Sequence, residues 1–422
     1  MNYNTILTMF GFNPNDFKPD ISDPVEEYGV FLLFLEQRTD INRICPHCNS
    51  KAVSIKDYDT ILLKNTINPG QKVQIFVKKV RFKCKQCKIS FTPALTNVCA
   101  NTNIPTSIKR LIINEFRQMI SFSDIAKRYD VSQKTVFNIF DETFPYVERS
   151  VLPKILCIDE FYFTKQIDQK YCCALVDYNR GQLVDIIKNR RKEYLNEYFS
   201  KISIKERENV KYFISDMYDE YAIVRKKYFP NAIPIVDKFH IVIQLTTAIK
   251  KIRTKVMNSQ KQTNYVLYTF MKNNWELFEA SRNKIPNKNY KSKKTGYQYH
   301  YEDLFYQCLR LDNNLSRAND ILQEIICKLK FAPKNEIEKK IESIADRLIV
   351  SDNEELQKVG RTYLKWKIGI INAYSNLEIG KKLTNAIAET TNNHIKTIIK
   401  VSYGLSNFER FRKRALIISR KK

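Results

Sequence analysis

The chain has 422 residues, 43% of them hydrophobic, so it is long enough for two to four domains with separate cores and too apolar for a disordered chain. Lysine and arginine outnumber aspartate and glutamate by 71 to 45, and the formal charge of +26 favours a polyanionic partner such as DNA or RNA. The longest apolar stretches, such as residues 30–35, are too short to span a bilayer, and the first residues lack a secretory pattern, so we expect a cytoplasmic protein with no membrane contact.

A zinc ribbon is predicted over residues 43–92, after an N-terminal segment, residues 1–42, without a functional motif. Ten cysteines in a large chain without a secretory signal argue against a disulfide framework, and two CxxC pairs flank strand-like stretches over residues 53–63 and 73–82. Four thiolates close a tetrahedral site, so we expect one structural zinc; the alternative is four buried free thiols. The ligands would be Cys45, Cys48, Cys84 and Cys87, with His47 as a bystander.

A helix-turn-helix DNA-binding unit is predicted over residues 100–148, with its two helices between Ser121 and Phe140. Its small core would comprise Ile125, Ala126, Val131, Val136 and Phe140. Ser132 is placed to cap the second helix, whose first two turns could contact base edges or phosphates. The contacting residues would be Gln133, Lys134, Thr135 and Asn138. The alternative is an ordinary helical hairpin with a solvated polar face.

From residue 153 the pattern changes to short apolar strands separated by polar turns and helices. Strands are predicted over residues 155–158, 171–176 and 183–187, followed by a helix over 192–202, a strand over 212–215, a second helix and a strand over 232–236. The first strand runs into Asp159, the fourth ends at Asp216 and the fifth at Asp237. This order suggests a ribonuclease-H-like fold, with residues 153–250 as its first part, in a multidomain α+β or α/β protein.

Residues 251–380 are predicted to be mainly helical, with an exposed loop over residues 283–294. Residues 381–422 would form a closing helix, from about residue 383 to residue 400, and a basic tail. Four polar residues of this helix are offset by four, three and four positions and therefore share one face. They are Asn385, Glu389, Asn392 and Lys396.

Acidic residues at strand ends suit metal-dependent phosphodiester chemistry. Two divalent ions about 4 Å apart can activate the attacking oxygen and stabilise the leaving oxygen, and carboxylates hold Mg²⁺ or Mn²⁺. Asp159, Asp216 and Glu389, from two strands and the closing helix, would form such a site. A single aspartate at a strand end is more often a helix cap or turn residue. The competing acids nearby are Asp168, Asp177 and Asp185.

These motifs together resemble those of the ISL3 family of insertion-sequence transposases, over nearly the whole chain. The first acid lies in Ile158-Asp159-Glu160-Phe161, the second in Ser215-Asp216-Met217 and the third in the run from Asn385 to Lys396. Val236-Asp237-Lys238-Phe239-His240 resembles the family's Asp-Arg-Phe-His element, with lysine in place of arginine. The resemblance implies that Asp159, Asp216 and Glu389 are the catalytic triad and that residues 251–380 are an insertion within a ribonuclease-H-like catalytic domain.

The resemblance further implies a transposase that binds the terminal inverted repeats of its element, cleaves them and performs strand transfer with two Mg²⁺ or Mn²⁺ ions. Its partners would be double-stranded DNA, as element ends and target, and a second copy on paired ends, in the bacterial cytoplasm at the nucleoid. Accessory roles are open for Asp237, His240, Asn385, Asn392 and Lys396, and His240 could equally be a helix-start residue. Two alternatives stay open: a transcription regulator with a non-catalytic assembly domain, and a nuclease without strand transfer.

Overall fold

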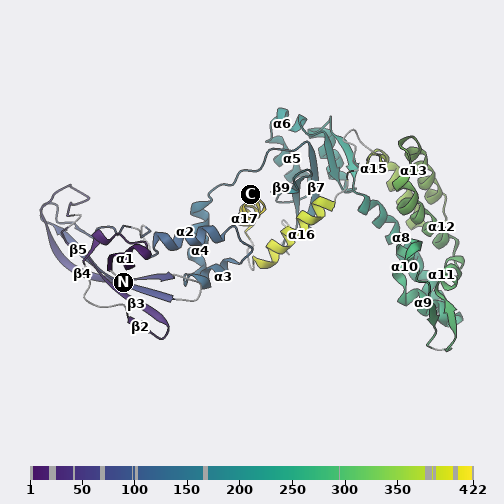
Figure 1. Ribbon diagram of the computed structural model, residues 1–422. Coiled ribbons are helices and arrows are strands. Elements are labelled where there is room, and N and C mark those ends of the chain that lie inside the picture. The colour runs from purple at the N-terminus through teal and green to yellow at the C-terminus, as the bar shows by residue number, and fades with distance from the viewer. Residues whose placement is uncertain are drawn as a thin grey trace. The chain divides into compact units, whose positions relative to one another are not determined.

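The structure, a computed structural model, describes residues 3–18, 25–40, 43–66, 72–96, 98–99, 103–164, 170–293, 295–375, 383, 386–402 and 407–420. It divides the chain into two compact units: Met1–Glu148 with Ile395–Lys422, here unit 1, and Arg149–His394, here unit 2 (Figure 1). Each unit contains a sheet and several helices, so the chain is a mixed protein of helices and strands. Among the described residues, no helix combines the length and apolar composition needed to cross a bilayer.

The sheet of unit 1 is built on a long antiparallel hairpin of β4 (Val53–Thr66) and β5 (Lys72–Cys84). β3 (Val30–Gln37) pairs in parallel with β5, β1 (Phe17–Lys18) and β2 (Val25–Glu27) pair with β3, and β6 (Ser90–Phe91) pairs with β5. In the first half of β5, Val73, Ile75 and Val77 point inward, as expected of a strand with one buried face, and they share a core with Leu7 of α1 (Tyr3–Met9). The domain boundary expected between residues 42 and 43 therefore lies between β3 and β4, which belong to the same sheet.

The second part of unit 1 contains α2 (Thr106–Glu115), α3 (Phe122–Arg128) and α4 (Gln133–Thr143). The prediction that Ser132 caps α4 is confirmed, because its hydroxyl accepts a hydrogen bond from the Thr135 amide at 3.1 Å. Asp130 adopts a φ of 50°, in the left-handed region, which turns the chain sharply between α3 and α4. Four of the five predicted core residues are buried, and Val131 is half-buried.

A helix from the far end of the sequence, α17 (Phe408–Ser419), packs onto α2–α4 within unit 1. Arg414 on α17 is 1% exposed and donates hydrogen bonds to the carbonyl oxygens of Gln118, at 3.0 Å, and Ile120, at 2.7 Å. Arg410 donates to the Asp141 carboxylate of α4 at 2.6 Å. The segment expected as a basic tail is therefore a packed helix over these residues, because its charged groups have partners within the unit.

Unit 2 contains a five-stranded sheet in the order β11-β10-β7-β8-β9; its strands β7 and β9 are labelled in Figure 1. β7 (Ile155–Tyr162), β8 (Tyr171–Asp177) and β9 (Gln182–Ile187) run antiparallel, whereas β10 (Tyr212–Ser215) and β11 (Ile233–Val236) run parallel to β7. α5 (Lys192–Ser200), the short α6 (Ile204–Glu208) and α7 (Asp219–Tyr228) connect the later strands. The predicted order of three strands, helix, strand, helix and strand is confirmed, with α6 as an addition.

One face of this sheet is buried under α5 and α7. Leu156 and Ile158 of β7 and Phe213 of β10 belong to the core that Leu195 and Tyr221 of these helices complete. Because successive side chains of a strand point to opposite faces, Asp159 and Asp216 lie on the other face. The sheet thus separates a hydrophobic core from the acidic residues singled out by the sequence.

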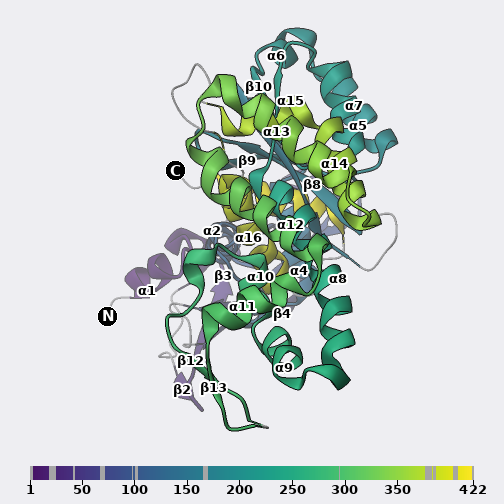
Figure 2. The same ribbon diagram turned by 90° about the vertical axis from the view of Figure 1, so that its right-hand side faces the viewer.

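The rest of unit 2 is mainly helical, and α12 and α14 pack against the long α8 (Figure 2). The helices are α8 (Lys238–Thr263), α9 (Tyr265–Asn273), α10 (Trp275–Glu279), η3 (Arg282–Lys284), α11 (Tyr301–Arg310), α12 (Asn313–Gln323), η4 (Glu324–Lys328), η5 (Leu329–Phe331), α13 (Lys334–Ile349), α14 (Glu354–Lys365) and α15 (Lys367–Tyr374). α15 packs along β11, where Gly369 approaches Val236 so closely that an added Cβ would lie 2.7 Å from its Cγ2. This contact joins the helical part to the edge of the sheet.

The prediction of an exposed loop over residues 283–294 is wrong in part, because β12 (Asn289–Lys291) pairs with β13 (Gln298–His300) in an antiparallel hairpin. Tyr290 holds this hairpin on the helices. Its ring packs edge-on against Phe270 at 5.3 Å between centroids, and its hydroxyl donates to Thr269 Oγ1 at 3.2 Å. The many lysines and asparagines of the stretch obscured one inward-facing aromatic residue.

Candidate active site and metal centres

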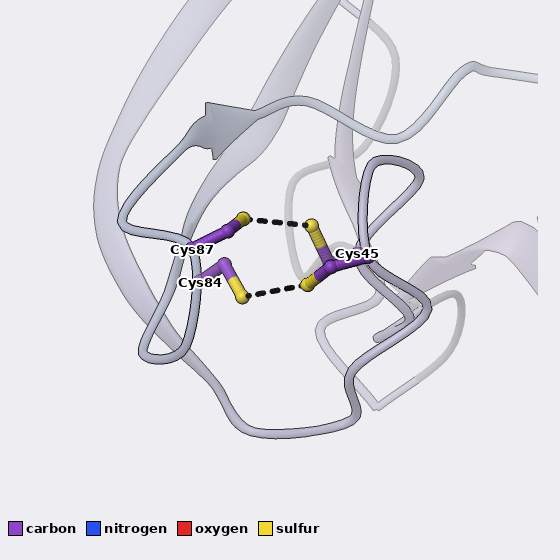
Figure 3. A group of neighbouring side chains, drawn as sticks. Cys45, Cys84 and Cys87 are labelled. Atoms are coloured by element: carbon purple, nitrogen blue, oxygen red, sulfur yellow. Dashed lines mark hydrogen bonds between the residues drawn. The ribbon is translucent and has the colours of Figure 1, made fainter.

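Four cysteine sulfur atoms come together in unit 1, all within 4.8 Å of one another. Cys45 Sγ lies 3.6 Å from Cys87 Sγ (Figure 3). Cys48 Sγ lies 3.6 Å from Cys84 Sγ. His47 is exposed and is not in this group. A closed set of four thiolates is the donor set that tetrahedral Zn²⁺ prefers, so the residues present fit the zinc ribbon expected from the sequence.

The two CxxC loops have the same backbone geometry. The residue after each second cysteine is left-handed, with φ of 56° at Asn49 and 63° at Lys88. The amide of each first cysteine donates to the carbonyl five residues later, from Cys45 to Ser50 and from Cys84 to Ile89, both at 2.9 Å. Backbone amides also point at the sulfur atoms, and the N–H of Cys87 is the main reason that the pKa of Cys84 is lowered to about 6. Burial and the neighbouring sulfur atoms raise the pKa values of Cys48 and Cys87, although a backbone amide acts against the rise at each, so the loops favour the thiolate at the first cysteine of each pair.

In unit 2, two aspartates lie side by side on the face of the sheet opposite to α5 and α7. β7 and β10 are parallel neighbours in a register that pairs Cys157 with Ile214, and Asp159 and Asp216 each follow two residues later. Both carboxylates are half-buried. Burial raises the pKa of each to about 6, and the Asp216 charge adds to the rise at Asp159. Two carboxylates that repel each other in a partly dry site are suited to binding a divalent cation.

Both aspartates are held by backbone amides at one oxygen. Asp159 Oδ1 accepts from the Glu160 amide at 2.8 Å, and Asp216 Oδ1 accepts from the Tyr218 amide at 3.1 Å. These bonds fix the carboxylates in position while leaving lone pairs available on each.

The closing helix, α16 (Ala386–Val401), reaches the first aspartate. Asn392 Nδ2 donates to Asp159 Oδ2 at 2.6 Å, a contact between residues 233 positions apart. Glu389 lies on α16 one turn earlier, but its side chain and the whole of Asn385 are outside the described residues. Lys396 is exposed and belongs to unit 1. Of the four polar residues expected on one face, the structure therefore places Asn392 at the aspartates.

Asp237 and His240 join the acidic group from the start of α8. Asp237 caps the helix by accepting from the Phe239 amide at 3.3 Å, and its second oxygen lies 3.1 Å from His240 Nδ1. The hydrogen bond to Asp237 raises the pKa of His240, and the charges of Asp216 and Asp159 add to the rise. The two residues thus take part in the helix start and also lie near both aspartates.

One pair of residues near the site was not foreseen from the sequence. Arg190, just after β9, donates to both oxygens of Glu160 at 2.7 and 2.6 Å, and its guanidinium lies over the rings of Tyr171 and Tyr218. Arg190 also lowers the pKa of Asp216, although burial outweighs this effect. No local pattern could reveal this pair, because the two residues lie 30 positions apart in the chain and Arg190 lies beyond the end of β9.

The competing acids have other roles in the structure. Asp185 is fully buried and accepts from the Tyr198 hydroxyl at 2.7 Å, whereas Asp177 accepts from the amides of the turn after β8. Asp168 lies outside the described residues. Both described acids are thus occupied by hydrogen bonds that stabilise the sheet.

The four residues expected to contact DNA lie along α4. Gln133, Lys134 and Asn138 are exposed, and Thr135 is half-buried with its hydroxyl 2.9 Å from Ser132 Oγ. Three of these side chains are therefore accessible to a partner.

Comparison with protein families adds a separate observation. The model of a transposase family, ISL3, matches residues 156–415 of this chain. The match covers more than half of the 422 residues and includes β7, β10 and α16. No curated protein matches the sequence.

Proposed function

Since the chain belongs to the ISL3 family of transposases, and so to enzymes that cut DNA, we propose that it cleaves the ends of an insertion sequence and joins them to target DNA through Asp159, Asp216 and Glu389. We propose that these residues hold two Mg²⁺ or Mn²⁺ ions. The observation that carries this proposal is the register of β7 and β10, which sets two half-buried aspartates with raised pKa values side by side. The strand order β11-β10-β7-β8-β9, with its parallel and antiparallel pairs, supports a ribonuclease-H-like assignment of this domain.

Divalent ions bound there would activate the attacking oxygen and stabilise the leaving oxygen of a phosphodiester. The residues of the chain prepare the site for this chemistry. Backbone amides orient Asp159 and Asp216, and Asp237 fixes the ring of His240. A protonated His240 would place a positive donor near the acids, where it could hold a phosphate oxygen. Arg190 pairs with Glu160, the residue after Asp159 on β7, and so neutralises its charge.

Unit 1 would recognise the inverted repeats. We propose that α4 contacts DNA through Gln133, Lys134, Thr135 and Asn138, and that one structural Zn²⁺ held by the four clustered cysteines stabilises the adjoining sheet. The excess of basic residues supports binding to phosphates of double-stranded DNA at the element ends and the target. A homodimer would bring two ends together, and the nucleoid in the bacterial cytoplasm would be its place of action.

The test compares cleavage of a DNA fragment bearing the element end in Mg²⁺ by the wild-type protein and by Asp159→Asn, Asp216→Asn and Glu389→Gln. Asp219→Asn serves as the control, because Asp219 is an exposed acid on α7 that pairs with Lys365. We expect the three site variants to bind the fragment normally and to lose nicking and joining, with the control unchanged. Cleavage by all three variants would refute the metal site, and a wild-type protein that binds but never cuts would favour the regulator. Nicks without joined products would favour a nuclease.

A further inference from the structure

Asn392 is buried at the acidic site with only one end of its amide satisfied. The residue is 4% exposed, and its Nδ2 donates to Asp159 Oδ2 at 2.6 Å. Its Oδ1 is also buried and, among the described residues, has no hydrogen-bond partner. Leaving such an oxygen without a partner costs about 1–3 kcal/mol, so the position calls for a group that this oxygen can bind.

The orientation of the amide follows from its neighbour. An ionised carboxylate only accepts hydrogen bonds, so the NH₂ group of Asn392 must face Asp159. The reverse orientation would bring two oxygen acceptors together at 2.6 Å. Among the described residues Oδ1 is therefore the end of the amide without a partner, and it belongs to a side chain bonded to a carboxylate whose pKa is raised in part by the charge of Asp216.

The chemistry around Oδ1 favours a cation as its partner. Asp159 and Asp216 repel each other, and an amide oxygen is a neutral hard donor of the kind that completes Mg²⁺ or Mn²⁺ sites without adding charge. Resting on the proposed function, we propose that Asn392 has two roles: its Nδ2 positions Asp159, and its Oδ1 is a further oxygen ligand of a divalent ion held between the two aspartates. Asn392 lies on α16 three residues after Glu389, so both residues share one helix face.

The two roles of Asn392 respond differently to substitution. Asn392→Ala removes both the donor and the oxygen. Asn392→Asp has nearly the same shape, removes the donor and keeps an oxygen at the end that faces the ion. If Oδ1 is a ligand, the aspartate variant keeps the affinity for the ion, whereas a residue that only positions Asp159 loses it in both variants.

The measurement is Mn²⁺ binding to the full chain by isothermal titration calorimetry, without DNA and with the zinc site loaded. We expect Asn392→Ala to weaken binding by roughly 10–100-fold, the range for residues that support metal ligands, and Asn392→Asp to bind within about threefold of the wild type or more tightly. Asn393→Ala, an exposed asparagine next to it on α16, should bind as the wild type. Thermal unfolding without metal checks that every variant is folded.

Two results would overturn the inference. Equal weakening in Asn392→Ala and Asn392→Asp would leave only the positioning role, and unchanged affinity in both would remove both roles. Asp216→Asn, measured in the same way, distinguishes this failure from that of the proposed function. If Asp216→Asn abolishes Mn²⁺ binding while the Asn392 variants do not alter it, only the assignment of Asn392 fails. If Asp216→Asn also leaves binding unchanged, the metal site itself fails.

Discussion

Replacement of Arg414 by alanine should destabilise the helical part of unit 1 while leaving unit 2 unchanged. This arginine of α17 is almost completely buried, and its two hydrogen bonds end on carbonyl groups of the segment that joins α2 to α3. Its guanidinium also lies 4.5 Å from the ring centroid of Phe122, the first residue of α3. A single side chain therefore ties the end of the sequence to a helix almost 300 residues earlier.

The expected loss can be worked from these contacts. Each hydrogen bond from a charged donor contributes about 1.5–3 kcal/mol, and a desolvated cation over an aromatic ring contributes about 2 kcal/mol. Two features reduce this loss. Burial disfavours the charge of Arg414 and lowers its pKa to about 10, and its Nε has no hydrogen-bond partner among the described residues. The net cost should be about 3 kcal/mol for Arg414→Ala and about 2 kcal/mol for Arg414→Met, which retains most of the packing volume.

Hydrogen exchange followed by mass spectrometry can locate this loss. About 3 kcal/mol corresponds to roughly 100-fold faster exchange of the amides of α2–α4, if these amides exchange through opening of this helical part. Both tryptophans of the chain, Trp275 and Trp366, lie in unit 2, so their fluorescence should not change. Arg110→Ala, at an exposed position of α2, is the matched control. Exchange in α2–α4 that is no faster in Arg414→Ala than in this control would refute the reasoning.

Three further outcomes are expected. Cys84→Ser, which replaces a thiolate by a poor zinc ligand, should reduce bound zinc from about one equivalent to none in elemental analysis, and retention of the metal would contradict the proposed centre. Gly360→Ala places a methyl group 2.7 Å from the Ala345 carbonyl oxygen, so α13 and α14 must move apart. The free energy of unfolding, measured by urea denaturation with tryptophan fluorescence, should fall by about 1–3 kcal/mol. An unchanged free energy of unfolding would show that the two helices adapt without cost. Arg149 lowers the pKa of Glu206 below its ordinary value of 4.5, so this pair stabilises the fold above that pH and loses its effect as pH falls through the lowered value. The stability gap between the wild type and Glu206→Gln should therefore be largest at pH 7 and shrink below pH 4.5, and a gap independent of pH would count against this origin.

Much of the local structure could be predicted because it depends on short sequence patterns. Apolar runs and turns placed the strands of the five-stranded sheet of unit 2 to within a few residues, and CxxC spacing identified the four cysteines. Ser132 could be recognised as a cap because its partner is only three residues away. The loop over residues 283–294 failed for the converse reason, since the contact of Tyr290 with Phe270 gives no signal in the local charge pattern.

Sequence by itself determined which residues stand at the ends of strands and on the faces of helices, because a period of 2 or 3.6 residues is a property of the backbone. It singled out Asp159 and Asp216 but could not show that they are neighbours. Only the tertiary structure decided this, through the register of β7 against β10, and only it paired Asn392 with Asp159, Arg190 with Glu160, and Arg414 with the turn before α3. These contacts join residues from 30 to almost 300 positions apart. They form because burial of apolar faces by the sheet and its helices also carries polar groups into the interior, where an unpaired polar group is costly and must find a partner.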